Sequence, residues 1–385
     1  MKKTFSKINV WLFILMILYS AFGLLMIFSA SSIAAVLRYQ VSTNYFFVRQ
    51  LIFIILGFIA GFVILNFPTK IYRYFSKIAM FLILFLLIFL FFVGVVAGGA
   101  QSWYDLGVVN FQPTELAKIV LIIYMAVYYH KIATKKNITL MNMLFPILLA
   151  AICFFLIALQ PDFGGAFIIL MITAMIFISL PIGKKHKKTI FTVCGIGVAV
   201  LVVAVLCFGK NILSSYQVSR ILNYKNPCQR YMEDSGYQVC NGFIAIHNGG
   251  LFGVGLGEST QKYLYLPEAH TDFIFPIICE ELGIIVGIIV VLGYFIMLLL
   301  ILNIAKEADN LRNSILAYGV FCYLLAHILI NLLGVLGIIP LTGVPLPFLS
   351  YGGSYNLCVV IALFIVQRVN VENQLDKQRR KIENL

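Results

Sequence analysis

Three ionisable side chains stand directly before a long apolar stretch in residues 266–275, which read LPEAHTDFIF. They are Glu268, His270 and Asp272. A carboxylate at the edge of a membrane is costly, so its presence there indicates a functional site. A positioned carboxylate can act as a general base, taking a proton from an attacking hydroxyl. These three residues are therefore the first candidates for a site.

A second charged pair, Glu115 and Lys118, lies near the start of another apolar stretch. Residues three apart share one face of a helix. Because each charge would be costly against lipid, we expect the two to pair inside the protein. The spacing leaves two roles open, a structural ion pair or substrate handling. The preceding loop holds Trp103 and Tyr104, aromatic residues that also suit a membrane interface.

The largest polar segment, residues 209–271, contains Arg220 and a glycine-rich run at 248–259, NGGLFGVGLGES. Successive backbone N–H groups in such a run can cradle phosphate. A flexible turn is the alternative interpretation. The glycine spacing does not fit a dinucleotide-binding fingerprint, and no βαβ pattern surrounds it.

The composition predicts an all-α polytopic membrane protein, a single domain over 1–385. Of its residues, 62% are hydrophobic and 11% are charged, whereas a typical soluble domain has about 25% charged residues. Ten apolar stretches are long enough to cross a bilayer. They are 10–30, 50–67, 74–96, 113–130, 140–159, 164–182, 189–208, 272–303, 313–335 and 354–371. The eighth is too long for a straight crossing, so we expect part of it to project or tilt.

The charge pattern predicts the orientation. With both termini in the cytoplasm, most of the 28 Lys and Arg residues lie in cytoplasmic segments, including a basic tail at 372–385, and most acids lie outside. The net charge of +13 therefore reflects membrane orientation, and its dispersed basic residues argue against nucleic-acid binding. The first apolar stretch has a core of about 20 residues, longer than that of a signal peptide, so we expect a retained span.

Two further outer segments interrupt the helical pattern. Residues 160–162 read QPD, and 337–355 contain three prolines and four glycines. Irregular backbone at membrane depth is tolerated only where protein buries it or where it lines a cavity. We therefore expect the outer segments to converge on one outward-open cavity.

Cys228 and Cys240 share the outer loop, where a disulfide and two free thiols are both open interpretations. The other six cysteines lie in apolar stretches and are expected to pack as small core residues. No Cys/His spacing typical of a metal site occurs.

Taken together, these motifs resemble the shape, elongation, division and sporulation (SEDS) family of ten-span peptidoglycan glycosyltransferases. The matching segments are LPEAHTDFIF with EELG at 280–283, QPTELAK at 112–118, QPDFG at 160–164 and TGVPLPFLSYGGS at 342–354. The spellings GYQ and LPEAHTD are more similar to the division-type FtsW branch than to the RodA branch. Four positions depart from the family pattern: Ser102, residues 164–165, residues 245–248, and Tyr355 in place of a second serine.

The resemblance implies specific site residues. The family's essential acid falls on Asp272, its loop tryptophan on Trp103 and its loop arginine on Arg220. Its glutamate–lysine pair falls on Glu115 and Lys118. We expect Glu268 and His270 to contact substrate, with His270 as a supporting donor rather than the catalyst. Glu280 and Glu281 are expected to be structural.

The implied substrate is lipid II, a disaccharide-pentapeptide on a polyprenyl pyrophosphate. Asp272 would deprotonate the acceptor 4-hydroxyl, and cations or a divalent metal such as Mg²⁺ would offset the charge of the leaving pyrophosphate. The implied place is the bacterial plasma membrane at the division septum. The implied partners are a class B penicillin-binding transpeptidase and other division proteins.

The glycines at 283, 287 and 293 suggest a docking face for that partner, with packing inside this chain's own bundle as the alternative. Two other functions remain open. A lipid flippase would need polar residues along a complete path across the membrane, and a noncatalytic scaffold for the transpeptidase would not need Asp272.

Overall fold

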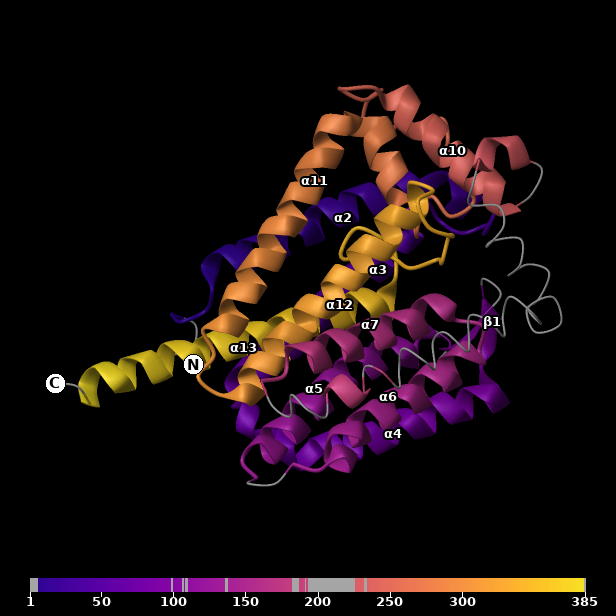
Figure 1. Ribbon diagram of the computed structural model, residues 1–385. Coiled ribbons are helices and arrows are strands. Elements are labelled where there is room, and N and C mark those ends of the chain that lie inside the picture. Colours follow the sequence, from indigo (N-terminus) through magenta and orange to yellow (C-terminus); the bar gives the residue numbers. More distant parts are fainter. Residues whose placement is uncertain are drawn as a thin grey trace.

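The structure is a computed structural model that describes residues 6–97, 100–105, 107, 110–135, 138–181, 187–190, 192, 226–231 and 234–383. The described chain is a helical bundle with one small sheet (Figure 1). The helices are α2 (Val10–Leu37), α3 (Tyr45–Asn66), α4 (Tyr72–Val93), α5 (Pro113–Ala133), α6 (Leu140–Ala158), α7 (Phe163–Ser179), α10 (Asp234–Gly249), α11 (Ile274–Lys306), α12 (Leu311–Val335) and α13 (Gly353–Glu383). Two short 3-10 helices are η1 (Thr69–Ile71) and η2 (Pro227–Arg230).

Eight of the ten predicted spans are confirmed as helices that could cross a membrane, and the sixth, 164–182, corresponds to a shorter apolar helix. Eight helices are long and apolar enough to cross a membrane, η1 being counted with α4, and α7 is a shorter apolar helix of 17 residues. The seventh predicted span, 189–208, lies almost entirely outside the described residues. The described part of the chain is therefore that of an integral membrane protein.

Three helices form the centre of the bundle. α5, α12 and α13 are the most buried spans, whereas α3, α4 and α6 each leave one side exposed. The central helices also carry several of the buried polar side chains, among them Glu115, Lys118, His327 and Asn331. Polar residues inside a membrane protein face the bundle interior because lipid offers them no hydrogen bonds.

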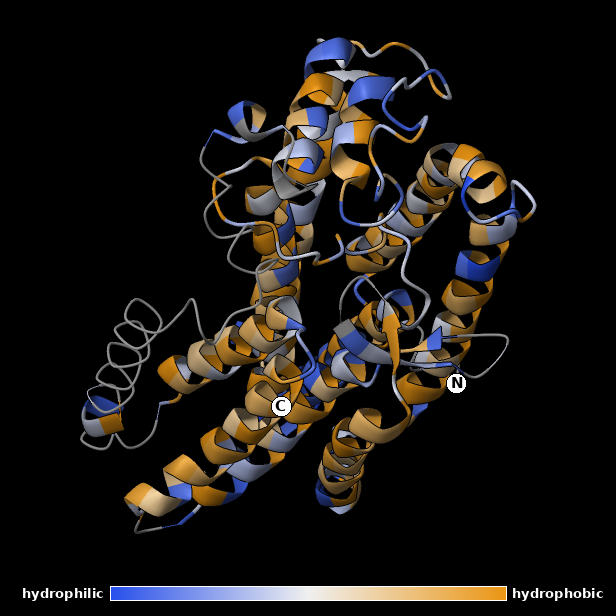
Figure 2. Cartoon of the chain, turned by 90° about the vertical axis from the view of Figure 1, so that its right-hand side faces the viewer, coloured by the Kyte–Doolittle hydropathy of each residue, from blue (hydrophilic) through white to orange (hydrophobic). Residues whose placement is uncertain are grey.

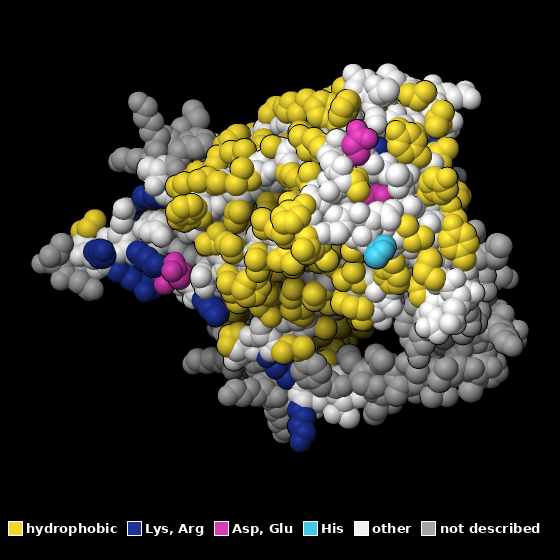
Figure 3. Space-filling model, turned by 90° about the horizontal axis from the view of Figure 1, so that it is seen from above, with side chains coloured by type: hydrophobic (Ala, Val, Ile, Leu, Met, Phe, Trp, Pro, Cys, Tyr) yellow, Lys and Arg dark blue, Asp and Glu magenta, His cyan; other side chains and the backbone are white. Residues whose placement is uncertain are grey.

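The surface has the profile of a membrane protein. Figure 2 shows hydrophobic residues over much of the described helices. In Figure 3, hydrophobic side chains cover the middle of the visible face, most basic side chains lie towards the end that holds both chain termini, and most acidic side chains and a histidine lie towards the other end. The basic tail predicted at 372–385 is, as far as the structure describes it, the end of α13, which continues as helix to Glu383.

α11 is broken rather than straight, as its length predicted. Gly283 has φ 86° and ψ 163°, so 274–282 and 284–306 form two helical pieces that meet at an angle (Figure 1). A Cβ at Gly283 would lie 2.2 Å from the carbonyl oxygen of Leu251, so only glycine fits. The second piece alone is about 34 Å long at 1.5 Å per residue, which suffices to cross the hydrocarbon core.

The glycine-rich run closes this break. The N–H groups of Val254 and Gly255 donate to the carbonyls of Glu280 and Glu281 at 2.9 Å, and the N–H of Ile284 donates to Gly250 O at 3.0 Å. These groups lost their helical partners at the break. The amides of Val254 and Gly255 therefore serve the helix break and are not free to cradle phosphate. The turn interpretation agrees with the turns at residues 250–252 and 256–257.

The two acids at the break have structural contacts, as expected. Glu281 accepts from Lys262 Nζ at 2.9 Å and from Ser29 Oγ of α2 at 2.6 Å. Glu280 accepts hydrogen bonds from Ser259 and Thr260 in the outer loop. All the side chains in these contacts are buried except that of Thr260. This network, centred on the Lys262–Glu281 ion pair, fixes the outer loop to α2 and α11.

The glycines suggested for partner docking pack inside this chain. A Cβ on Gly287 would lie 2.7 Å from Cys279 Sγ, and one on Gly293 would lie 2.3 Å from Tyr19 Oη. Gly283 contacts the outer loop, as described above. The docking interpretation of these glycines is therefore wrong, and the alternative is confirmed.

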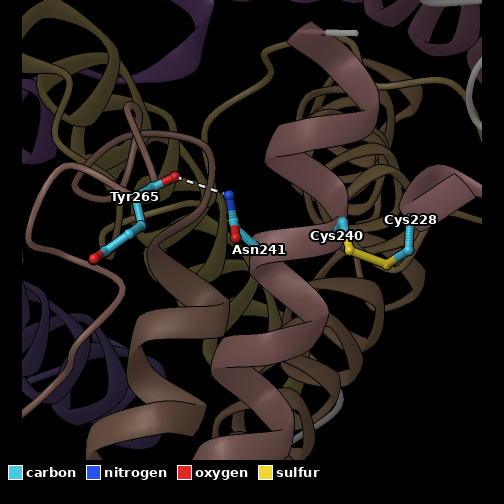
Figure 4. The surroundings of a disulfide bond; sticks show 4 residues. All are labelled: Cys228, Cys240, Asn241 and Tyr265. Atoms are coloured by element: carbon cyan, nitrogen blue, oxygen red, sulfur yellow. Dashed lines mark hydrogen bonds between the residues drawn. A yellow bond between two sulfur atoms is a disulfide. The ribbon is translucent and has the colours of Figure 1, made fainter. Parts of the chain in front are cut away.

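The large polar segment 209–271 contains a helix that the sequence did not predict. α10 packs on the first piece of α11, where Gly242 faces the ring of Phe273. A disulfide between Cys228 and Cys240 joins η2 to α10, and Asn241 donates to Tyr265 O at 3.0 Å (Figure 4). The disulfide interpretation is confirmed over that of two free thiols.

We predict that Cys228 and Cys240 resist alkylation in unreduced protein and both react after reduction. Linking residues 12 apart in sequence restricts the unfolded chain by about 3 kcal/mol on the chain-entropy view, so reduction should also lower stability. Peptide mapping by mass spectrometry measures the labelling, with the buried free Cys153 and Cys322 as internal controls. Two freely alkylated thiols in unreduced protein from an oxidising compartment would contradict the bridge.

Candidate active site

Asp272 lies in a tight turn two residues before α11. The carbonyl of Glu268 accepts from the N–H groups of Thr271 and Phe273 at 3.3 and 3.1 Å, which closes the turn. The helix begins at Ile274, and its N-cap residue, Phe273, makes no side-chain capping hydrogen bond. The predicted stretch 272–303 therefore begins as helix two residues late, at Ile274. Asp272 lies before the first turn, where the helix dipole acts most strongly.

The carboxylate of Asp272 faces the irregular segment between α12 and α13. A Cβ on Gly343 would lie 3.5 Å from Asp272 Oδ2, and Gly343 has φ +71°. On the other side, a Cβ on Gly164 at the start of α7 would lie 2.6 Å from Val344 Cγ2. Residues 342–344 are thus held between α7 and the turn that carries Asp272.

The connecting segments predicted to converge do contact one another, while the outward-open cavity between them stays a prediction. Gln101 N donates to Gln160 O at 3.2 Å, which joins the sheet to the α6–α7 connection. Gln112 donates from its backbone to Ser354 Oγ and from its side chain to Asp162 Oδ2, both at 3.3 Å. Three connections far apart in sequence therefore meet at the end of the bundle that holds Asp272.

Trp103 lies on a small antiparallel sheet rather than in a loop. The strands are β1 (Val95–Ala97), β2 (Ala100–Asp105) and β3 (Asn110–Phe111), in the order β1-β2-β3. Trp103 pairs with Val95, and its side chain is partly exposed. Tyr104 donates to Leu86 O on α4 at 2.7 Å, which anchors the sheet to the bundle.

Glu115 and Lys118 form the expected ion pair inside the bundle. Lys118 Nζ lies 2.7 Å from Glu115 Oε1 and 3.1 Å from His327 Nε2. Tyr323 on α12 donates to Glu115 Oε2 at 3.4 Å. Lys118 is 1% exposed. The interpretation of Glu115 and Lys118 as a structural ion pair is therefore confirmed, while substrate contact by Lys118 stays a prediction.

The two neighbours of Asp272 have different surroundings. Glu268 is partly exposed, accepts from Thr271 Oγ1 at 2.8 Å and lies 3.8 Å from Arg38 Nη1. His270 is 2% exposed, and its ring centroid lies 4.6 Å from that of Phe46 and 5.8 Å from that of Tyr351. Its carbonyl accepts from Tyr351 N at 2.8 Å. His270 thus fixes the turn through its backbone and its packing.

Burial, together with the charge of Arg38, lowers the pKa of His270 to about 4. The unfolded chain takes up this proton near its ordinary pKa of about 6.5, so between these values the unfolded state binds more protons. We predict that stability falls as the pH drops from 6.5 towards 4 and that His270→Phe removes this component. Thermal unfolding in detergent across this range measures it. Equal pH slopes for wild type and variant would contradict the burial of a neutral imidazole.

The remaining site predictions cannot be placed. Arg220 lies outside the described residues. The described residues hold no group of three His, Cys, Asp or Glu side chains that could bind a metal by themselves.

Sequence reasoning missed two residues of this region. Asn331 and His327 both contact the segment that faces Asp272, and neither was predicted as a site residue. They are four apart on α12 and so share one face. The signal was available, because a polar residue inside a span is a functional hypothesis by default. Lys262 was also missed, since a lysine in a loop gives no sign of burial.

A family model described as "Cell cycle protein", which covers FtsW, RodA and SpoVE, matches residues 9–375. The chain belongs to this family. The family assignment agrees with the resemblance drawn from the motifs.

Curated relatives match over nearly their whole length. "Probable peptidoglycan glycosyltransferase FtsW" of Bacillus subtilis is 38% identical over 397 residues, covering 100% of this chain and 96% of that protein. "Stage V sporulation protein E" of the same species is 36% identical over 365 residues, covering 93% and 96%.

Solved structures share the fold. A chain of a peptidoglycan synthase complex, in which polymerization and crosslinking are coordinated, matches with a TM-score of 0.74 at 24% identity, covering 95% of this chain and 98% of that one. RodA of Thermus thermophilus matches with a TM-score of 0.67 at 23% identity, covering 94% and 96%. At these identities the matches show the fold alone.

Proposed function

We propose that this FtsW-like chain is a peptidoglycan glycosyltransferase that polymerises lipid II at the outer face of the plasma membrane during cell division. The observation that carries the proposal is the placement of Asp272. Its carboxylate lies at the end of the bundle where three connections converge, opposite the bare backbone of Gly343. The names of the curated relatives support the reaction class.

The chemistry requires one base. Asp272 accepts the proton of the acceptor sugar 4-hydroxyl while that oxygen attacks the anomeric carbon of the donor. A C–O bond forms to the acceptor, and the C–O bond to pyrophosphate breaks, so the pyrophosphate leaves with the electron pair. The configuration inverts from the α-linked donor to a β-1,4 glycan. A single displacement therefore suffices, and no covalent intermediate with the protein is needed.

The leaving pyrophosphate requires positive charge. We assign this role to Arg220, whose planar guanidinium suits phosphate, and to Lys118 as a supporting cation. Lys118 is buried in the ion pair with Glu115. It therefore stabilises the pyrophosphate through its electrostatic field, and direct contact would require substrate binding to separate the pair. Trp103 and Glu268, which are both partly exposed, are assigned to substrate contacts.

The partner that we assign to this polymerase is a class B transpeptidase, and we assign the complex to the septum. Both termini of this chain are assigned to the cytoplasm. The structural relative within a peptidoglycan synthase complex supports this assignment. A polymerase alone would leave glycan strands uncross-linked.

The proposal is tested with purified chain reconstituted in vesicles that contain lipid II, with and without a class B transpeptidase. We expect a ladder of glycan strands on a gel, and more product in the presence of the partner. Translocation of labelled lipid II without polymer would instead support a flippase. Polymer formation only by another protein in the mixture would support a scaffold.

A further inference from the structure

Two polar side chains of α12 face the segment that lies against Asp272. His327 and Asn331 are one helical turn apart and are 0% and 3% exposed. The connection that contains this segment, residues 337–355, has three prolines, which have no N–H to donate. Buried carbonyl groups still need donors, and α12 supplies them from its side chains.

Asn331 connects two backbone segments through one amide group. Its Nδ2 donates to Asp272 O at 2.9 Å and to Val344 O at 2.8 Å. Both hydrogens of the amide are thereby used, which fixes which end of the group is nitrogen. Its Oδ1 has no partner among the described residues. The two donated bonds therefore set the orientation of the side chain.

His327 supports the next residue of the same segment. Its Nδ1 lies 3.2 Å from Pro345 O, and its Nε2 lies 3.1 Å from Lys118 Nζ. A lysine ammonium group can only donate, so Nε2 accepts and Nδ1 carries the proton given to Pro345. The ring of Tyr355 stacks on the imidazole at 4.7 Å between centroids. His327 thus links the Glu115–Lys118 pair to the segment that faces Asp272.

We propose that Asn331 is a positioning residue for Asp272, with His327 as the second anchor of the same clip. The clip is the set of hydrogen bonds from these two side chains to Asp272, Val344 and Pro345. It fixes the turn that carries the base relative to the backbone opposite its carboxylate. This inference rests on the proposed function for the role of Asp272.

A positioning role for these hydrogen bonds predicts different kinetic effects from a purely structural role. A base displaced by about 1 Å lowers the rate of the chemical step up to about 100-fold. Substrate binding elsewhere in the site is unaffected. Removing Asn331 therefore lowers kcat with little change in KM. A structural amide elsewhere in the bundle would lower stability and leave both constants of the folded protein unchanged.

The experiment compares Asn331→Leu with Asn373→Leu in the purified full-length chain. Asn373 is a matched control, because it is 1% exposed and donates to a backbone carbonyl, Ile304 O, at 3.0 Å near the cytoplasmic ends of α11 and α13. Hydrogen exchange is measured on peptides covering 266–275 and 340–348. The kcat and KM for lipid II polymerisation are measured on the same samples.

For Asn331→Leu we expect about tenfold faster exchange in both peptides, the effect of losing one such hydrogen bond, and a kcat lowered by about 10- to 100-fold with KM within about threefold. Asn373→Leu should change neither. Unchanged exchange, or faster exchange with the kcat of the control, would overturn the proposal. Asn331→Ala replaces the leucine variant if that one does not fold. If wild type makes no glycan, the proposed function fails, while the exchange data still decide whether Asn331 holds the turn.

Discussion

Asp272→Asn should lower glycan polymerisation by about 100-fold or more, the usual size of a general base contribution. Asparagine keeps the shape of the side chain and cannot accept the proton of the attacking hydroxyl. The backbone carbonyl that Asn331 holds is unchanged by the substitution, so the turn and the fold should persist. Polymer from purified protein and lipid II is measured on a gel, alongside the thermal midpoint.

Asp105→Asn is the control for this variant. Asp105 is exposed at the end of β2, and its carboxylate accepts only a local hydrogen bond from Gly107 N at 2.8 Å among the contacts of the described residues. We expect its polymerisation rate to stay within about twofold of wild type, as for a surface change. A near wild-type rate for Asp272→Asn would remove Asp272 from the role of base.

Glu281→Met should be the most destabilising single substitution that we predict. It leaves the ammonium group of Lys262 buried, with its side chain 3% exposed and its ion-pair partner removed. Removing one partner of a buried pair costs about 3–5 kcal/mol because the other charge stays desolvated. Unfolding by denaturant in detergent measures the loss. The double variant Lys262→Met/Glu281→Met should recover much of it, since no unpaired charge remains.

An exposed ion pair provides the comparison. Lys377 and Glu307 lie 2.9 Å apart with both side chains 47% exposed, so Lys377→Met should cost less than about 1 kcal/mol. If Glu281→Met cost no more than Lys377→Met, the network at the α11 break would not stabilise the fold.

Much of the fold could be predicted from the sequence because a bilayer requires long apolar helices. The overlong eighth stretch predicted the broken α11, and the i, i+3 spacing predicted the Glu115–Lys118 pair. The closing of the break by residues 249–255 could not be predicted. It depends on backbone hydrogen bonds between segments about 30 residues apart, which leave no periodic pattern in either one.

The site was predicted in its residues more than in its connections. The motif at 266–275 identified Asp272 as a site residue, but nothing in the sequence indicated its contact with Asn331. Asn331 binds the backbone carbonyl of Asp272, and every residue type has that carbonyl, so the contact leaves no pattern at position 272. His270 shows the converse. Its place in the motif suggested substrate contact. In the structure, the His270 ring packs against Phe46 of α3 and Tyr351 of the segment before α13, which are far from it in sequence.

The central claim is that this chain itself inverts the donor sugar of lipid II, with Asp272 as the base. The direct measurement incubates radiolabelled lipid II with purified wild type, or with Asp272→Asn of equal thermal stability, and digests the product with a muramidase specific for β-1,4 linkages. We predict long strands from wild type that the muramidase cuts fully to disaccharide units, and no strands from the variant. Strands from both proteins at similar rates, or wild-type strands that resist the muramidase, would contradict the account.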